Sequence, residues 1–321
     1  MSSKQRVVLL LSIIINLFIF NSVQANETKT DKPIKIILND WTSQIVLSHI
    51  TAGLFQEMGY SVAFSKKSSN AQWGALQRGL AHVQMEVWQG TMEKMYTRMI
   101  GNGGIVDAGE HEAKTREEWW FPDYVVDVCP GLPDWKALKK CAHIFATDET
   151  SPRGRYLGGP WEKPDGAKIR ALGLNLKVVP AKNSDVLWEE LGKAVQNKQP
   201  IVLFNWTPNW VEAKYKGQFV EFPNYHPDCE TKPEWGENKN FLYDCGNPKN
   251  GWLKKVAWRQ MPIQWPCAFK TLTQISFSNT MLAMLAYDVD VNQLTHQQAA
   301  NKWLAENKPL WKSWLSPSCS V

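Results

Sequence analysis

Short apolar runs and amphipathic segments alternate along residues 34–87. Residues 34–38, 61–64 and 82–87 are short and rich in apolar side chains, and they predict buried strands. Residues 44–58 repeat apolar side chains at helical spacing, and residues 69–80 open with Ser-Asn-Ala-Gln, which resembles a capping box, so both predict helices. Strands that alternate with helices through short links predict an α/β fold, with a parallel sheet covered by helices on both faces.

A second α/β unit follows after a change of pattern. A Gly-rich loop at 101–109 and an extended segment at 124–128 lead into it. Its expected elements are a short helix at 134–141, a segment at 155–159 that enters the Trp161 loop, strands at 177–180 and 201–204, and a helix at 184–197. Residues 218–262 are long, polar and rich in Pro and Gly, which predicts a surface insertion. The chain then ends in helices expected at 279–286, 295–306 (with Thr295 as N-cap) and 309–315.

The first 25 residues predict a cleavable secretory signal peptide. Lys4 and Arg6 precede an apolar run at 7–20, and Val23 and Ala25 stand at the −3 and −1 positions of an expected cut after Ala25. The run is short for a membrane span, although an uncleaved N-terminal anchor is the alternative. No later segment is apolar enough to cross a bilayer, so we expect an exported chain.

Six Cys in an oxidising compartment predict disulfides. The preferred pairing closes two short loops and leaves the remaining two Cys to hold the C-terminal tail: Cys129–Cys141, Cys229–Cys245 and Cys267–Cys319. The rival is a structural metal, for which only His226 and Cys229 have a plausible short spacing. We therefore expect no metal site and no cofactor.

Composition adds one unusual feature, an excess of Trp. The 321 residues contain 17 Trp but only 12 Phe and 8 Tyr. Any aromatic residue supplies buried apolar area, whereas Trp also has the best ring face for a cation. The apolar share of 44% and the charged share of 21% are those of a globular protein. The net charge of +5 falls to 34 − 31 = +3 without Lys4 and Arg6, and with no long basic run a nucleic-acid partner is not expected.

Some of the Trp residues stand where ligands bind in α/β proteins, beyond the carboxyl ends of strands. Three directly follow predicted strands: Trp41, Trp88 and Trp206. Three more lie in loops that flank the second unit: Trp119, Trp120 and Trp161. These six are candidate binding residues, with packing as the alternative for each, and we expect the other Trp residues to be packing and insertion residues.

Several Trp faces around one cleft form an aromatic cage, which suits a methylated ammonium or sulfonium ion. Such a cation has no N–H to donate and is weakly hydrated, so aromatic faces replace its water at little cost. Each desolvated cation–π contact is worth up to about 2 kcal/mol, so about four contacts approach the roughly 8 kcal/mol of micromolar affinity. The placement of the Trp residues therefore points to an onium ligand.

Four short motifs support this interpretation. They are Asn-Asp-Trp-Thr-Ser at 39–43, Val-Trp-Gln-Gly at 87–90, Cys-Pro-Gly-Leu-Pro-Asp-Trp-Lys-Ala-Leu at 129–138 and Asn-Trp-Thr-Pro-Asn-Trp at 205–210. With them the sequence resembles the periplasmic glycine betaine/proline betaine-binding proteins of ABC importers, a family that also includes choline and trimethylamine N-oxide binders. The resemblance covers roughly residues 34–315 and is weakest over 218–262.

The resemblance implies the two-lobed α/β fold of type II periplasmic binding proteins, in which each lobe is a mainly parallel sheet flanked by helices. The first lobe would comprise 33–121 and 265–315, and the second 122–264 with the insertion 218–262, followed by a tail at 316–321. The crossovers would lie near 120–128 and 261–268. The lobes would close on the ligand, and the closed form, a monomer, would dock on an ABC permease.

The family's ligand-boxing role is carried by match to Trp88, Trp206 and Trp161 first, and then to Trp41 and Trp120. We expect Trp41 and Trp88 on one lobe and Trp161 and Trp206 on the other, because a ligand favours closure only if it contacts both lobes.

Two departures from the family pattern concern the part of the site that reads the ligand's tail. Met92 stands where many betaine binders have a His that donates to a carboxylate, and Trp161 is followed by Glu162 and Lys163 where some carry Trp-Gly-Cys. Glycine betaine is therefore the first expectation, with trimethylamine N-oxide, dimethylsulfoniopropionate and choline left open.

An acidic residue near the cage would favour a hydroxyl or N-oxide partner. Glu118, beside Trp119 and Trp120, and Asp40, beside Trp41, are the candidates. The alternative is that both side chains are solvated carboxylates on the protein surface.

Other function classes find less support in the sequence. It contains no Gly-x-Ser-x-Gly, no phosphate loop and no His-Glu-x-x-His, so we do not expect an enzyme. A secreted carbohydrate binder or glycosidase that stacks Trp on sugar rings is the rival, and a glycosidase needs a pair of facing carboxylates. Glu117 and Glu118 are adjacent and would point apart on a strand, so they do not resemble such a pair.

Overall fold

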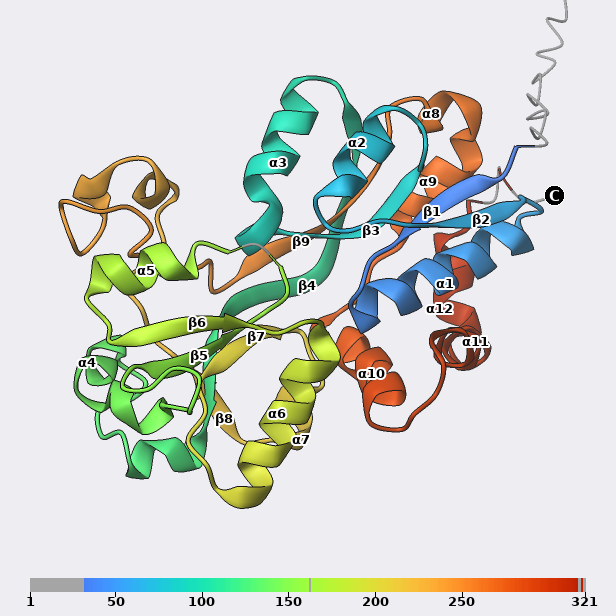
Figure 1. Cartoon of the computed structure of the whole chain (residues 1–321). Helices are drawn as coiled ribbons and strands as arrows, with labels where there is room; N and C mark the ends of the chain where they lie inside the picture. Colours follow the sequence, from blue (N-terminus) through green and yellow to red (C-terminus); the bar gives the residue numbers. More distant parts are fainter. Residues whose placement is uncertain (1–31, 162, 317–318, 320–321) are drawn as a thin grey trace, which may run out of the picture.

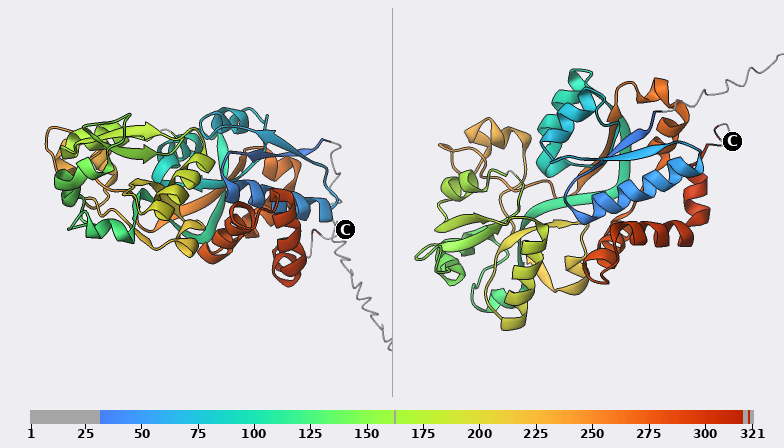
Figure 2. Two further views of the ribbon diagram at one scale, coloured as in Figure 1. Left: turned by 60° about the horizontal axis from the view of Figure 1, so that its bottom comes forward. Right: turned by 45° about the vertical axis from the view of Figure 1, so that its right-hand side comes forward.

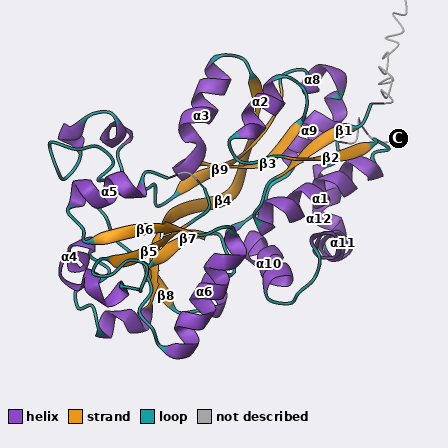
Figure 3. Ribbon diagram, in the orientation of Figure 1, coloured by secondary structure: helices purple, strands orange, loops and turns teal. Residues whose placement is uncertain are grey.

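A computed structural model describes residues 32–161, 163–316 and 319, and the predicted signal peptide with its cut after Ala25 lies outside this part of the chain. A sheet flanked by helices forms the body of the molecule (Figures 1 and 3). In chain order the strands are β1 (Ile34–Leu38), β2 (Val62–Lys66), β3 (Val83–Trp88), β4 (Ile105–Pro122), β5 (Gly154–Gly158), β6 (Leu176–Pro180), β7 (Leu203–Thr207), β8 (Gly217–Phe219) and β9 (Gly251–Trp258). The helices are α1 (Thr42–Glu57), α2 (Ala71–Gln77), α3 (Gln89–Gly101), α4 (Leu138–Cys141), α5 (Asp165–Leu172), α6 (Ser184–Asn197), α7 (Val211–Lys214), α8 (Met261–Gln264), α9 (Pro266–Gln274), α10 (Asn279–Asp290), α11 (His296–Glu306) and α12 (Lys308–Trp314).

The strand order is β2-β1-β3-β9-β4-β7-β5-β6, with β8 also paired to β4. Strand β1 runs parallel to β2 and β3, and β5 runs parallel to β6 and β7, so each end of the sheet is the parallel α/β unit that the alternating pattern predicts. Between them, β9 is antiparallel to β3 and β4, and β4 is antiparallel to β7. The two parallel units are therefore joined by antiparallel strands.

Strand β4 passes from one half of the sheet to the other. Its residues up to Thr115 pair with β9, and from Arg116 onward it pairs with β7 and β8. Thr115 is paired with Gly251 at the start of β9, so the outgoing and returning chain lie side by side there. We call the part before this passage the first half (β2, β1, β3, β9 and the start of β4) and the part beyond it the second half. Figure 2 shows the two halves from two further sides, with β4 running between them.

Helices cover both faces of the first half. Figure 1 shows α1 and α10 to α12 on one side of the sheet and α2 and α3 on the other. The helix predicted at 44–58 is α1, which buries Val46, Ile50 and Leu54 against the sheet and against α11. In the second half, α6 coincides with the predicted helix at 184–197, and its Leu187, Leu191 and Ala194 are buried as the pattern requires.

The sequence pattern missed one strand and misplaced three features. The missed strand is β4, which begins at Ile105 within the segment 101–109 expected as a Gly-rich loop. Residues 124–128, expected to be extended, lie mostly in a 3-10 helix at Asp123–Asp127. Part of the segment 218–262, expected as a surface insertion, is strand β9, which lies inside the sheet between β3 and β4. The capping box expected at residues 69–72 is also wrong. The backbone N–H of Gln72 donates to the backbone oxygen of Ser68 and not to the Ser69 hydroxyl, and the hydroxyl of Ser68 accepts from the backbone N–H of Ala71.

Three disulfides confirm the pairing expected from the sequence: Cys129–Cys141, Cys229–Cys245 and Cys267–Cys319. The second ties the segment between β8 and β9, and the third joins the start of α9 to the chain end. With both sulfurs of Cys229 and Cys245 in a disulfide, the metal site imagined at His226 and Cys229 has no free thiolate.

Within the described residues, no helix is long and apolar enough to span a membrane.

The N-terminus of α11 offers a test of local stability, because it carries the predicted cap in full. The Thr295 hydroxyl accepts from the backbone N–H of Gln298, whose side chain accepts from the backbone N–H of Thr295. We expect Thr295→Ala to lower the free energy of unfolding by about 1 kcal/mol, since it leaves an N–H at the helix end without its acceptor. Urea denaturation followed by circular dichroism measures this. Thr295→Ser, which keeps the oxygen, is the control and should stay close to the original chain; an equal loss in both variants would contradict the capping role.

Candidate functional site

The site is built around a buried carboxylate, that of Glu86 in β3. Its Oε2 accepts hydrogen bonds from the indole Nε1 of Trp41 at 2.6 Å, from Nε1 of Trp88 at 2.9 Å and from the hydroxyl of Ser43 at 3.1 Å. Glu86 and Trp88 are two residues apart on one strand and so share a face, and Trp41 is the N-cap residue of α1. One acceptor therefore holds two indole rings from two separate elements.

The surroundings of Glu86 change its protonation. The side chain is fully buried, and its Oε1 has no hydrogen-bond partner among the described residues. Burial raises the pKa of Glu86 to about 7, although the bonds donated by Trp41, Ser43 and Trp88 oppose this. The proton is therefore held only weakly at neutral pH.

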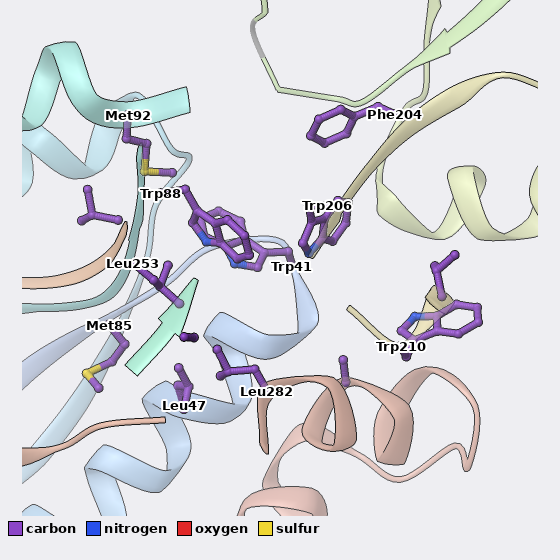
Figure 4. Close-up of a cluster of buried hydrophobic side chains, with 14 of the residues drawn as sticks. Trp41, Leu47, Met85, Trp88, Met92, Phe204, Trp206, Trp210, Leu253 and Leu282 are labelled. Carbon is purple, nitrogen blue, oxygen red and sulfur yellow. The ribbon is translucent and has the colours of Figure 1, made fainter. Parts of the chain in front are cut away.

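The second half contributes further aromatic rings. Trp206 lies in β7, and Trp161 follows β5. The Trp161 ring stands edge-on to Trp206, with centroids 5.2 Å apart, and edge-on to Trp41, at 6.1 Å. Its Nε1 donates to Asp40 Oδ1 at 3.1 Å. Figure 4 shows Trp41 and Trp88 on one side, facing Trp206 and Phe204 on the other.

These rings surround a small cavity, which we call the cage cavity. Its lining residues are Trp41, Trp88, Thr91, Met92, Glu117, Trp161, Phe204 and Trp206. The rings approach so closely that the cavity measures only about 30 Å³. The cavity as it stands is therefore smaller than a group with several methyls.

Glu117 supplies the acidic wall of the cage cavity. Its Oε1 bonds to the hydroxyl of Thr91 and, at 3.2 Å, to the ammonium of Lys163, while its Oε2 is buried and has no partner among the described residues. A Cβ on Gly90 would stand 2.6 Å from that Oε2, so a larger residue here would have to displace the carboxylate from its present position. The small Gly90 of the Trp-Gln-Gly motif at 88–90 thus lies directly against the Glu117 carboxylate.

Four of the candidate residues come together, and two do not. Trp41, Trp88, Trp161 and Trp206 line one cavity, with the first two from the first half and the last two from the second. Trp119 is buried elsewhere: its ring stacks on Tyr156 at 3.9 Å, and its Nε1 donates to Asp165 at 2.8 Å.

Trp120 is fully buried and does not line the cage cavity.

The two acidic candidates, Asp40 and Glu118, lie in different places relative to the cage cavity. Asp40 is near the cage, where its carboxylate accepts from the Trp161 indole. Glu118 points away from the cage cavity and bonds to Lys168 Nζ at 3.0 Å and to the backbone N–H of Asn247 at 2.8 Å, so its expected role beside the ligand is not seen. Its neighbour Glu117 takes that place, because adjacent residues of a strand point to opposite sides. Glu118 and Glu117 are buried, so the solvated-surface alternative is wrong for Glu118, whereas Asp40 is exposed as that alternative expects.

The sequence interpretation missed three contributors: Glu86, Glu117 and Phe204. Glu86 had a visible signal, since an acidic residue stands inside an apolar strand two positions before a candidate Trp. Glu117 lies within β4 and Phe204 within β7. Their place in the cavity wall depends on residues far away in the sequence, so it leaves no local signal.

A wider cavity of about 750 Å³ adjoins the cage cavity, and Thr91 lines both. It lies between α3 and the segment 225–247 that precedes β9. Tyr225 of that segment donates to Glu93 of α3 at 2.9 Å, and Lys94 of α3 pairs with Glu230. Asn238 of the same segment donates to the backbone oxygen of Ala171 in α5 at 2.9 Å, so the segment 225–247 contacts both α3 and α5.

The described residues offer few ligands for a metal ion. In the part of the chain that the structure describes, the grouping of possible ligands is Cys229, Asp244 and Cys245. Both cysteines are oxidised to a disulfide, which leaves one carboxylate.

Comparisons with known proteins agree with this geometry. A sequence model described as the substrate binding domain of ABC-type glycine betaine transport system matches residues 32–306. The trimethylamine N-oxide-binding protein of Pelagibacter ubique (strain HTCC1062) is 36% identical over 317 residues, which are 96% of this chain and 98% of that protein.

Among solved structures, the glycine betaine/L-proline-binding protein ProX from Borrelia burgdorferi superposes with a TM-score of 0.72 at 17% identity, over 90% of this chain and 98% of that one. A choline binding protein of an ABC transporter in complex with choline gives 0.71 at 16% identity, over 88% and 92%. Lactococcal OpuAC, closed on glycine betaine, gives 0.68 at 16% identity, over 89% and 100%. These likenesses confirm the fold class expected from the sequence.

The buried Glu86 predicts a pH dependence of stability. Its folded pKa of about 7 lies above the ordinary value of 4.5 for a glutamate. Between these values the folded chain keeps a proton that the unfolded chain loses, so stability falls as pH rises. Glu86→Gln keeps an oxygen for the two indoles and removes the titration. We expect the free energy of unfolding of Glu86→Gln, minus that of the original chain, to grow by roughly 2 kcal/mol between about pH 5 and about pH 8.

Urea denaturation of both chains at the two pH values measures this difference. Burial lowers the pKa of His82 to about 4 and that of His111 to about 3, which acts in the opposite direction. These contributions are common to both chains and cancel in the comparison. Identical pH slopes in the two chains would show that Glu86 does not titrate in this window.

Proposed function

We propose trimethylamine N-oxide as the ligand of this chain, which belongs to the family of substrate-binding domains of ABC-type glycine betaine transport systems. Proteins of this family capture small methylated onium compounds outside the cytoplasmic membrane, work with ABC permeases and are not enzymes. We place this chain in the periplasm as a monomer, exported by a signal peptide that is cut after Ala25.

The observation that carries the proposal is the cage cavity, with aromatic faces from both halves of the sheet and a carboxylate in its wall. Trp41, Trp88, Trp161 and Trp206 offer ring faces to a cation that has no N–H to donate, each worth up to about 2 kcal/mol when water is excluded. The cation lies between the halves, so its contacts favour the closed arrangement over the open one.

Glu117 favours an N-oxide over a betaine. Both ligands carry negative oxygen, but a carboxylate tail, as in glycine betaine, brings two oxygens that need donors toward the partnerless Glu117 Oε2, which can only repel them. The single oxygen of an N-oxide needs only one donor, and Lys163 Nζ lies 3.2 Å from the other Glu117 oxygen. The Pelagibacter ubique relative, named for trimethylamine N-oxide, supports the same choice.

Choline is the second candidate, because its hydroxyl is a donor that the Glu117 Oε2 lacks among the described residues. The cage would hold its trimethylammonium head in the same way.

Several hydrogen bonds join the two halves of the molecule and would stabilise its closed arrangement. Lys163, beyond β5, donates to the hydroxyl of Thr91 in α3 at 2.8 Å. Ser184 at the start of α6 donates to the backbone oxygen of Asp40 at 3.4 Å, and Trp161 donates to the Asp40 carboxylate. We propose that these contacts form as the ligand is enclosed and that the closed form docks on the permease.

Isothermal titration calorimetry with a set of ligands tests the proposal. The set is trimethylamine N-oxide, glycine betaine, dimethylsulfoniopropionate, choline and a disaccharide. We expect trimethylamine N-oxide to bind most tightly and the disaccharide not to bind. Tightest binding of choline would select the second candidate, and binding of the disaccharide alone would contradict the cage altogether.

A second test removes one ring. Trp206→Ala should weaken binding of the best methylated ligand at least tenfold, or about 1.4 kcal/mol, because the cation loses an aromatic face. Trp235→Ala is the matched control, since Trp235 is 49% exposed and does not line the cage cavity. Calorimetry of both variants measures the effect; a change within about twofold in Trp206→Ala would identify Trp206 as a packing residue.

A further inference from the structure

Lys163 places an ammonium group beside the site proposed to bind an onium ion. Its side chain is 7% exposed. The Nζ donates to Thr91 Oγ1 at 2.8 Å and to Glu117 Oε1 at 3.2 Å, and it lies 4.5 Å from the centroid of the Phe204 ring. All three partners line the cage cavity, so the ammonium stands at its edge.

The charges at the cage cavity balance because of Lys163. Among the described residues that line the cavity, Glu117 is the acidic one, and Lys163 forms an ion pair with it. Glu86 lies behind the rings, where its Oε2 is already held by three donors. Without Lys163, the Glu117 carboxylate would face the ligand alone.

The effect of this charge balance on affinity depends on the net charge of the ligand. An N-oxide or a betaine is a zwitterion, whose positive methylated head is accompanied by a negative oxygen. A free quaternary ammonium ion is a net cation. In a site with little water, a neighbouring ammonium repels a net cation strongly and a zwitterion weakly, and it can also donate to the zwitterion's oxygen.

We infer that Lys163 determines charge selectivity in this site: by neutralising Glu117 it makes the cage prefer net-neutral zwitterions to net cations of the same size. The inference rests on the proposed function, since it requires an onium ligand in the cage. Nothing in the aromatic rings could make this distinction, because they attract both heads alike.

The alternative is that Lys163 only fastens the two halves together. Its bonds reach Thr91 in α3 and Glu117 in β4, so removing them would also weaken closure. A loss of closure would reduce the affinity for every ligand by a similar factor. A charge role instead changes the ratio of affinities for two ligands of different charge.

The matched probes are trimethylamine N-oxide and tetramethylammonium, which share three N-methyl groups and differ in net charge. Calorimetry gives the ratio of their dissociation constants for the original chain and for Lys163→Met, which keeps the length of the side chain. We expect the ratio to shift at least tenfold toward tetramethylammonium in Lys163→Met. Lys163→Arg, which keeps the charge, should stay within about threefold of the original ratio.

Two further variants make the test independent of any loss of stability. Glu117→Gln, with Lys163 kept, should shift the ratio in the opposite direction, and the double variant with Lys163→Met should return it toward the original value, because the pair is then neutral again. Parallel losses for both probes in Lys163→Met, with an unchanged ratio, would overturn the inference and leave the proposed function standing. Failure of the original chain to bind either probe would overturn the proposed function itself.

Discussion

The aromatic site depends on one carboxylate that has been taken out of water. Glu86 is fully buried, and the groups that compensate for its lost hydration are the indole N–H groups of Trp41 and Trp88 together with the hydroxyl of Ser43. A buried carboxylate is costly without donors, so these bonds fix both rings before any ligand arrives. The indole nitrogens are used on the protein side, which leaves the ring faces for a cation.

Two carboxylates serve this site in different ways. Glu86 lies beneath the rings and positions them, whereas Glu117 forms part of the cavity wall and is paired with Lys163. Glu117 stands two residues beyond Thr115, where β4 crosses from the first half of the sheet to the second opposite Gly251. Its place next to that passage puts the acidic group between the two halves, where we propose that the ligand binds.

Local patterns predicted some of these elements and not others. β1 and α6 were predicted because apolar side chains repeat at the strand and helix periods. β4 was missed because its inward positions from His111 to Thr115 are not strongly apolar, so no alternation is visible in its sequence. β9 was interpreted as surface because it belongs to the polar, Pro- and Gly-rich segment 218–262. Its Lys255 is nevertheless buried, and the ammonium donates to the backbone oxygens of Glu110 and Ile275.

The sequence alone determined the kind of ligand, since Trp residues placed after parallel strands must gather at one edge of the sheet and can hold a methylated cation. It also favoured the disulfide pairing that the structure shows, two pairs because they close short loops and the third because it joins the two remaining Cys. Only the tertiary structure decided between Glu117 and Glu118, and only it brought Lys163 to the cage. Lys163 and Glu117 are 46 residues apart in the chain, and a contact over such a distance leaves no trace in the local periodicity from which helices and strands are predicted.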